Sequence, residues 1–465
     1  MNNAYNSTLF EETPIPKAVG KLVVPTILSS LVMVFYNLAD TYFVGQLNNA
    51  VQNAAVTLAA PVLLAFNAVN NLFGVGSSSM MSRSLGRKEY DVVRKSASFG
   101  LYCSFASGLL FSLLCLCFFR PLLGMLGANA ETAQATAGYL KWTVICGAAP
   151  SILNVVLAYL VRAEGNSLQA SIGTMSGCLL NVVLDPIFIF PWGLNMGAAG
   201  AGLATFLSNC AACAYFFVLL YRRRDKTLIS LNPKHFRFDR KIAGAVCVVG
   251  VPAAIQNLLN VTGMTILNNF TAAYGANAVA AMGIAQKVYM VPMQIALGGT
   301  QGVMPLVSYS YTAKNYKRFR GAIAFLARFM IPAMLAVAAA GWFCAPALIR
   351  LFIANAEVVR YGVGFLRALI IAVPFLVLDF LVVGICQAIG RGFTSLVFAV
   401  LRKVVFEIPA TVALNAAFGV AALAYGAFAA EIVMSVTGMV TLLRIFKKFK
   451  ASLAAPPEAV RRGAE

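Results

Sequence analysis

Long apolar stretches separated by short polar loops dominate the hydrophobicity pattern. From Leu22 to Ala39 no charged side chain interrupts the chain, which at about 1.5 Å per residue is long enough to cross a hydrocarbon core of roughly 30 Å. Runs of this length in lipid must be helices, because barrel strands are shorter. The pattern predicts an all-α polytopic membrane protein with twelve transmembrane helices, at residues 18–46, 51–76, 94–118, 139–162, 167–190, 199–221, 242–268, 277–305, 321–344, 361–387, 393–415 and 421–446.

Composition supports this assignment. Of the 465 residues, 60% are apolar and only 11% are charged, whereas about 25% of residues are charged in a typical soluble protein. A soluble globule is therefore excluded, and the lipid bilayer is the expected partner. The net charge is +20, but the basic residues recur in short loops and form no single face. We therefore expect no binding to nucleic acid.

The distribution of basic residues predicts the orientation. With the N-terminus inside, the loops after even-numbered spans and both tails hold Arg83, Arg87, Lys88, Arg94, Lys95, the run 222–224, Lys314, Lys317, Arg318, Arg320, Lys447 and Lys448. The opposite loops hold Arg120, Lys141, Arg350 and Arg360. By the positive-inside rule, both termini are cytoplasmic. Residues 1–16 lack the basic-then-apolar order of a cleaved signal peptide, so the first span is expected to direct insertion into the cytoplasmic (inner) membrane.

An internal repeat divides the chain into two halves. The segment Ala128–Glu131 recurs as Ala354–Glu357, an offset of about 226 residues, at which Lys88 also matches Lys314. An even number of spans in each half gives both halves the same orientation. We predict an N-terminal tail (1–17), an N-lobe (18–221), a linker (222–241), a C-lobe (242–446) and a C-terminal tail (447–465).

Two acids lie in the apolar spans of the first half. Asp40 lies inside the membrane in the far half of the first span, and Asp185 lies four residues after Asn181, on one face of the fifth. Thr205 begins the sixth span at a similar depth. Charged groups inside a membrane usually belong to an ion, proton or substrate pathway, and these oxygens suit H⁺ or Na⁺. The alternative is that Asp40 and Asp185 merely end their helices and that Asn181 and Thr205 serve helix packing.

The second half carries its polar residues differently. Asn154, Asn181 and Thr205 map onto Asp379, Glu407 and Glu431. The same half contains Lys287, Arg402 and Lys403, of which Lys403 forms an i, i+4 pair with Glu407. These residues are either a neutralised structural network or a second cation site.

Other chemistry is sparse. The ten cysteines show no C-x-x-C spacing, and His235 lies in a basic loop, so neither disulfides nor a metal site is expected. We find no constellation of catalytic nucleophile and base, and we expect a transporter without an organic cofactor rather than an enzyme. Pro25 interrupts the first span, where proline supplies a bend.

The sequence resembles the multidrug and toxic compound extrusion (MATE) family over almost all of its length after residue 15, and is most similar to the MepA-like and DinF-like branch. The matching segments are Pro25 with residues 37–45, residues 163–166, Asn181 with Asp185-Pro186, residues 197–202 leading to Thr205, and residues 387–391. Gln256 stands where other members carry an acid.

This resemblance implies a V-shaped pair of six-helix lobes that exports amphipathic, often cationic compounds by H⁺- or Na⁺-coupled antiport, as a monomer. It assigns Asp40, Asn181, Asp185 and Thr205 to the cation site, with Pro25 as the bending point of the first helix. It also makes Asn154 a neighbour of the cavity. The candidates for the substrate cavity or a C-lobe network are Asn37, Gln256, Lys287, Asp379, Glu407 and Glu431.

Two other transporter types remain alternatives. One is a lipid-linked oligosaccharide flippase of the same superfamily, and the other is a major-facilitator-type transporter, although residues 82–88 lack the usual acid before the arginine of that family. A channel would differ from all of these by uncoupled flux.

Overall fold

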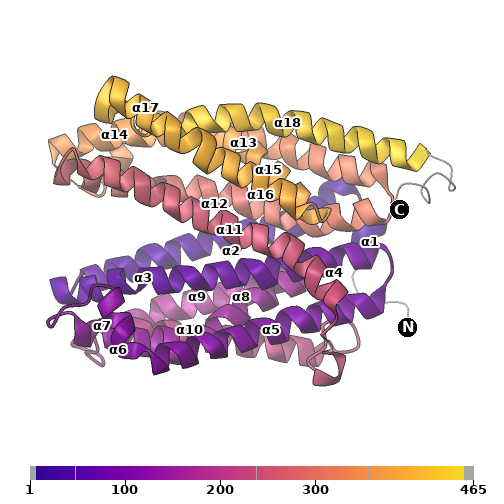
Figure 1. Ribbon diagram of the computed structural model, residues 1–465, viewed down its shortest axis with the longest axis horizontal. Coiled ribbons are helices and arrows are strands. Elements are labelled where there is room, and N and C mark those ends of the chain that lie inside the picture. The colour runs from indigo at the N-terminus through magenta and orange to yellow at the C-terminus, as the bar shows by residue number, and fades with distance from the viewer. Residues whose placement is uncertain (1–6, 48, 237, 354, 455–465) are drawn as a thin grey trace.

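A computed structural model describes residues 7–47, 49–236, 238–353 and 355–454, and all regular elements in these ranges are helices (Figure 1). The first half contains α1 (Ser7–Glu11), α2 (Ile15–Gly45), α3 (Ala50–Asn70), η1 (Asn71–Val75), α4 (Gly76–Gly86), α5 (Tyr90–Cys117), α6 (Phe119–Met125), α7 (Ala133–Leu140), η2 (Lys141–Cys146), α8 (Ala148–Ala163), α9 (Ser167–Ile189) and α10 (Ala198–Arg222). The second half contains η3 (Pro233–His235), α11 (Arg240–Ala272), α12 (Ala276–Thr312), α13 (Tyr316–Arg350), α14 (Ala356–Ile370), α15 (Val373–Ala388), α16 (Gly392–Val400), η4 (Leu401–Glu407), α17 (Ile408–Phe418), η5 (Gly419–Ala422) and α18 (Tyr425–Ala454).

The predicted spans correspond to these helices, with differences in detail. Among the described residues, nine helices are long and apolar enough to cross a membrane, and two bent pairs raise the number to eleven. The pairs bend by 50° before α8 and by 43° before α15. The remaining predicted span is α12, whose 37 residues are long enough to cross but include Lys287 and three glutamines. Within the predicted N-terminal tail the chain forms α1, and α2 begins at Ile15, three residues before the predicted start of the first span.

Local sequence signals explain where the helices begin and turn. The side chains of Asn49, Asp239 and Asn355 accept backbone N–H bonds at the starts of α3, α11 and α14, as N-cap residues do. Lys88 and Lys314 both have positive φ, at 62° and 58°. The same turn therefore recurs at the offset of the predicted repeat. Ala354, part of the repeated segment, lies outside the described residues.

The two halves of the chain form two bundles, with α2–α10 in one and α11–α18 in the other (Figure 1). One of the contacts between them is formed by α2 and α12. A Cβ placed on Gly302 would lie 2.8 Å from the Cα of Val23, and one on Gly298 would lie 3.1 Å from the Cα of Ile27. Glycine at these positions lets the two helix backbones approach each other.

The short helix α1 bridges the two lobes at the end of the molecule that also holds the end of α18 (Figure 1). Phe10 is buried and stacks on Tyr309 of α12 at 4.9 Å. The Tyr309 hydroxyl donates to Glu11, and Arg318 donates to the Leu9 carbonyl at 2.7 Å. On the N-lobe side, Lys88 lies 3.6 Å from Glu11. We call this end the terminus-bearing end.

The linker between the lobes is anchored by a buried acid. Glu164 follows α8 and is 1% exposed. Its carboxylate accepts from the Thr227 hydroxyl and from the Leu228 N–H, both at 2.7 Å. Burial raises the pKa of Glu164 to about 7, although these hydrogen bonds act in the opposite direction. Residues 163–166, one of the segments on which the family resemblance rests, therefore hold the linker against the N-lobe.

Substituting Gly302 with alanine should destabilise the interface between the lobes. The new Cβ would meet the backbone of α2, which cannot move aside as a side chain can, and overpacking of this kind costs about 1–3 kcal/mol. Gly283→Ala on the same helix is the matched control, because its Cβ meets nothing within 4 Å and alanine favours the helix by up to about 1 kcal/mol. Unfolding temperatures in one detergent would test this, and equal midpoints for both variants would contradict it.

The raised pKa of Glu164 predicts that stability falls as pH rises. Between the usual value of 4.5 and about 7, the folded state retains a proton that the unfolded state has lost, so the stabilisation present below pH 4.5 disappears as pH rises through 7. The change amounts to at most about 3 kcal/mol. The Glu164→Gln variant should show a flatter dependence of unfolding temperature on pH between 5 and 8. Identical profiles for both proteins would contradict this assignment.

Candidate functional site

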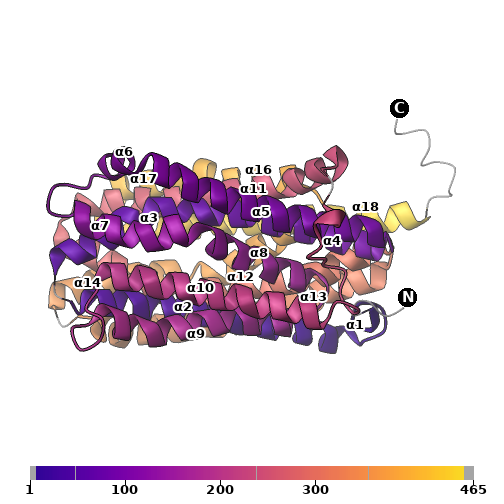
Figure 2. The same cartoon turned by 90° about the horizontal axis from the view of Figure 1, so that it is seen from below.

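The predicted N-lobe residues come together where α2, α9 and α10 pack side by side (Figure 2). With the Asn181 amide oriented to satisfy its neighbours, its nitrogen donates to Asp185 Oδ2 at 2.8 Å. Its oxygen then accepts from the Thr205 N–H at 3.0 Å and from the Thr205 hydroxyl at 3.3 Å. Asp40 on α2 lies close enough to Asp185 to interact electrostatically. We call Asp40, Asn181, Asp185 and Thr205 the N-lobe site.

This site contains oxygens without partners. Asn181 and Asp185 are 2% and 0% exposed, and Asp40 is half-buried. One carboxylate oxygen of each acid, Asp40 Oδ1 and Asp185 Oδ1, is buried and accepts no hydrogen bond within the described part of the chain. Buried polar atoms normally have partners. Two carboxylates with free oxygens in one polar cluster are suited to binding a proton or a small hard cation.

Two tyrosines complete this cluster, and the sequence did not single them out. The Tyr36 side chain hydrogen-bonds with Thr205, and Tyr36 lies near both acids. Tyr139 is 5% exposed and also lies near Asp40 and Asp185. Tyr36 precedes Asp40 by four residues, so helical spacing could have identified it. Nothing in the sequence distinguishes Tyr139 from the other aromatic residues in the spans.

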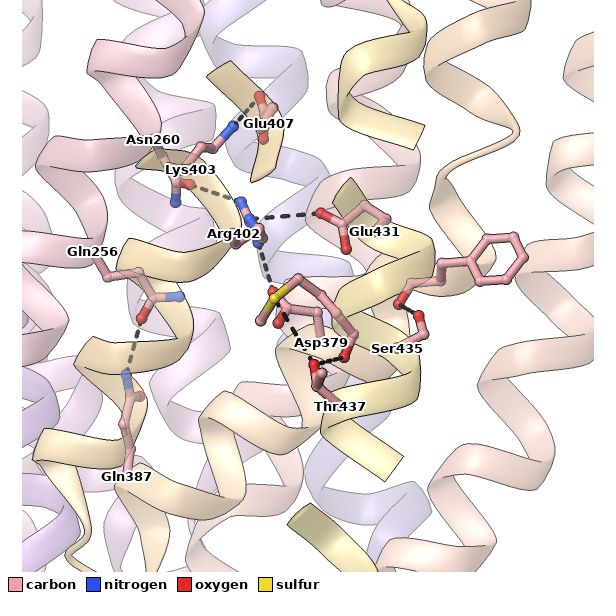
Figure 3. Close-up of polar contacts among 12 residues, drawn as sticks. Gln256, Asn260, Asp379, Gln387, Arg402, Lys403, Glu407, Glu431, Ser435 and Thr437 are labelled. Atoms are coloured by element: carbon pink, nitrogen blue, oxygen red, sulfur yellow. Dashed lines mark hydrogen bonds and ion pairs between the residues drawn. The ribbon is translucent and has the colours of Figure 1, made fainter. Parts of the chain in front are cut away.

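The C-lobe acids form an ion-pair network around Arg402 (Figure 3). Arg402 contacts Asp379 at 2.8 Å and Glu431 at 3.5 Å, and donates to Asn260 at 2.7 Å. All three charged residues are at least nine-tenths buried. The predicted Lys403–Glu407 pair is present at 2.6 Å. We call Asp379, Arg402, Lys403, Glu407 and Glu431 the C-lobe network. Its two basic residues pair with all three acids, while one oxygen of Asp379 and one of Glu431 accept no hydrogen bond within the described residues. Both alternatives, a structural network and a second cation site, stay predictions.

Three residues of this network lie on the short segment η4. This segment is π-helical, and its three charged residues, Arg402, Lys403 and Glu407, all line one cavity. Short π-helical segments often occur at functional sites. The hydrophobic pattern predicted a plain helix here, because periodicity does not report a change of helix type.

This cavity lies between the lobes and has a volume of about 600 Å³. Its N-lobe wall comes from α3, η1, α4 and α8, and its C-lobe wall from α11, α12, α15, η4 and α18. Toward the terminus-bearing end, the Ser79 hydroxyl donates to the Gln387 carbonyl at 2.6 Å. Gln301 also donates to the Tyr159 hydroxyl at 3.2 Å. These bonds join the two lobes across the cavity.

The predicted cavity residues divide into two groups. Gln256, Lys287, Glu407 and Glu431 line the cavity, and Gln256 accepts a hydrogen bond from Gln387 at 3.1 Å. The other candidates lie elsewhere. Asn37 is exposed on α2, Asn154 donates to Asn209 at 3.2 Å inside the N-lobe, and Asp379 lies behind Arg402. Asn37 and Asn154 therefore do not line this cavity, and a role for either residue in substrate binding stays a prediction.

The N-lobe site is separate from the cavity. None of its four residues is part of the cavity wall, because they face the interior of the α2, α9 and α10 bundle. Pro25 lies inside α2, which runs unbroken from Ile15 to Gly45. Since proline has no N–H, the helix lacks one hydrogen bond there, and the hinge role of Pro25 stays a prediction.

Arg162 is the cavity residue that the sequence analysis overlooked. It lies in the last turn of α8, lines the cavity and is 7% exposed. Its guanidinium lies over the Tyr159 ring at 5.7 Å. In the sequence it follows an apolar span, where an arginine resembles the many residues that set membrane orientation. Only the packing of α8 against the second lobe distinguishes it.

The fold and the cavity between two six-span lobes define a polytopic helical transporter. A profile of the MatE family matches residues 25–187 and 252–413, and the chain belongs to this family.

Two similar proteins are named multidrug export protein MepA. The one from Staphylococcus aureus (strain MSSA476) is 31% identical over 441 residues, covering 94% of this chain and 95% of the relative. The one from Staphylococcus haemolyticus (strain JCSC1435) is 32% identical, covering 92% and 94%.

A solved structure supports the same fold. It is described as the outward-facing conformation of a multidrug resistance MATE family transporter of the MOP superfamily, and it matches with a TM-score of 0.90 at 24% identity. The match covers 97% of this chain and 99% of that one. These findings place the chain among MATE transporters and away from the major facilitators.

Removing the central cation of the C-lobe network should strongly destabilise the protein. Arg402→Gln leaves Asp379 and Glu431 buried without their shared partner, and breaking a buried pair in this way costs about 3–5 kcal/mol. Combining it with Asp379→Asn should restore part of the loss. The control is Lys95→Gln, whose pair with Asp91 is largely solvated and worth under about 1 kcal/mol. Denaturant unfolding in detergent measures all four proteins, and similar losses for both single variants would contradict the prediction.

Proposed function

We propose that this protein exports amphipathic small molecules, often cationic, across the cytoplasmic membrane in exchange for H⁺ or Na⁺. Membership of the MatE family and the similarity to proteins named multidrug export protein support the export of drugs. The observation that carries the coupling is the pair of unpartnered carboxylate oxygens in the N-lobe site. Transport requires no covalent step and no organic cofactor.

The terminus-bearing end faces the cytoplasm in this proposal. Arg83, Arg87, Lys88 and Arg320 lie near this end, as the positive-inside rule requires. The contacts of α1 and the Ser79–Gln387 bond close this end, so the conformation is outward-facing. All residues of the N-lobe site come from one chain, and a monomer is the transporting unit.

The cycle then follows from the charge of the N-lobe site. When a cation enters from outside, it binds between Asp40 and Asp185, lowers the negative charge of this pair by one unit and compensates a free oxygen. This changes the packing of α2 against α9 and, because α2 also contacts α12, alters the interface between the lobes. Release of the cation inside restores the negative charge and completes the cycle. If the site binds the cation more tightly in one conformation than in the other, cation binding shifts the populations of the two conformations.

Asp40→Asn and Asp185→Asn should each abolish coupled export. An amide keeps the size of the side chain but cannot release a proton or supply a full negative charge to a cation. In proteoliposomes loaded with a fluorescent cation, we expect at least about a tenfold loss of rate, equivalent to about 1.4 kcal/mol in the barrier. Separate pH and Na⁺ gradients would identify the driving ion.

Glu131→Gln is the matched control, because Glu131 is an exposed acid in the loop before α7 and is not one of the residues of the N-lobe site. It should transport at the wild-type rate under either gradient. Full transport by both aspartate variants would contradict the proposed coupling site. Flux without a gradient requirement would instead indicate a channel.

A further inference from the structure

The basic residues of the cavity outnumber its acidic residues. Its wall contains Arg162, Lys287, Arg402 and Lys403 but only Glu407 and Glu431. Arg402 and Lys403 are engaged by the acids of the C-lobe network. Arg162 and Lys287 form no ion pair within the described part of the chain. With Asp379 behind Arg402 included, the C-lobe side has three basic and three acidic residues, so the excess positive charge of the cavity comes from Arg162.

Arg162 has the stronger need for a partner. It is more than nine-tenths buried, and its Nε makes no hydrogen bond. Nor does any other nitrogen of this side chain donate to a described residue. The carbonyl end of α8 and the Tyr159 ring offset part of the charge. A buried guanidinium without an acceptor is nevertheless costly, because charge is normally paired away from water.

The position of Arg162 is also fixed. The Tyr159 ring lies against the guanidinium, and the Tyr159 hydroxyl is held by Gln301 from α12 of the other lobe. Lys287 lies on the same helix fourteen residues before Gln301, which corresponds to roughly 20 Å along the axis. Arg162 thus lies deep in the cavity toward the terminus-bearing end, and the flexible Lys287 lies toward the opposite end.

We propose that the cavity binds amphipathic substrates that carry an acidic group, and that Arg162 binds this group. A planar guanidinium suits a carboxylate, which can accept two parallel hydrogen bonds. The apolar part of the substrate lies against the methionines of α12, which adapt to different shapes. This inference rests on the proposed export function and assigns to Arg162 the recognition of the acidic group.

A pair of dyes that differ only at the acidic group tests the proposal. Rhodamine B carries a free carboxylate, and its ethyl ester has the same aromatic core without that charge. Binding of each dye to the purified full-length protein is measured by fluorescence anisotropy, and transport is measured in proteoliposomes. For Arg162→Gln we expect about tenfold weaker binding of rhodamine B, the size of one charge-assisted hydrogen-bonded contact. Binding of the ester should change less than twofold.

Two further variants complete the design. Arg162→Lys keeps the charge but loses the planar fork, and rhodamine B should bind it with intermediate affinity. Arg360→Gln is the matched control, because Arg360 also lies over a tyrosine ring, at 5.3 Å, but lies outside the cavity. It should bind both dyes as the wild type does.

The outcomes separate this inference from the export function. Equal loss of both dyes in both Arg162 variants would indicate a structural role and overturn the inference. Unchanged binding of rhodamine B would also overturn it, while transport of the ester by the wild type would leave the export function in place. If the wild type transports neither dye under either ion gradient and binds neither, both proposals fail.

Discussion

The cost of leaving a charge uncompensated among apolar helices governs the arrangement of this molecule. In the C-lobe network the cost is met inside the protein, because Arg402 is enclosed by two acids and an amide oxygen. One oxygen of Asp379 and one of Glu431 accept no hydrogen bond, but both acids face the charge of Arg402. In the N-lobe site, Asp40 and Asp185 also each keep one oxygen without a partner, and neither acid forms an ion pair within the described part of the chain. Since solvent cannot supply a counter-charge in lipid, a mobile cation has to. The contrast distinguishes a network that holds structure from a site that exchanges ions.

This contrast also explains why the two lobes differ although they are related by an internal repeat. Repeat-related turns at Lys88 and Lys314 show that the backbone pattern is shared. The acids, however, occupy different positions, and only the second lobe places basic residues beside them. One lobe can thus respond to a cation while the other forms a fixed wall of the cavity. This difference is consistent with a cycle in which the packing of the N-lobe changes on cation binding while the C-lobe keeps its packing.

The sequence predicted the spans well, because long uncharged segments have few other solutions in lipid. It also identified the N-lobe site, since Asp40 and Asp185 stand out within apolar runs. It did not predict η4, because a change of helix type preserves hydrophobic periodicity. It included Asn37, one turn from Asp40, because spacing does not say how much of a helix face is covered. It overlooked Arg162, because an arginine at the end of a span has the same appearance whether it faces water or a cavity.

The helix α1 has a consequence for how the protein is made. Leu9 and Glu11 contact Arg318 and Tyr309, about three hundred residues later in the chain. During synthesis the ribosome releases α1 long before its docking surface exists, so this segment waits while the eight predicted spans up to α12 enter the bilayer. Joining of the two lobes at this end is therefore among the last steps of biogenesis, and a nascent chain truncated before residue 309 has no means of forming it.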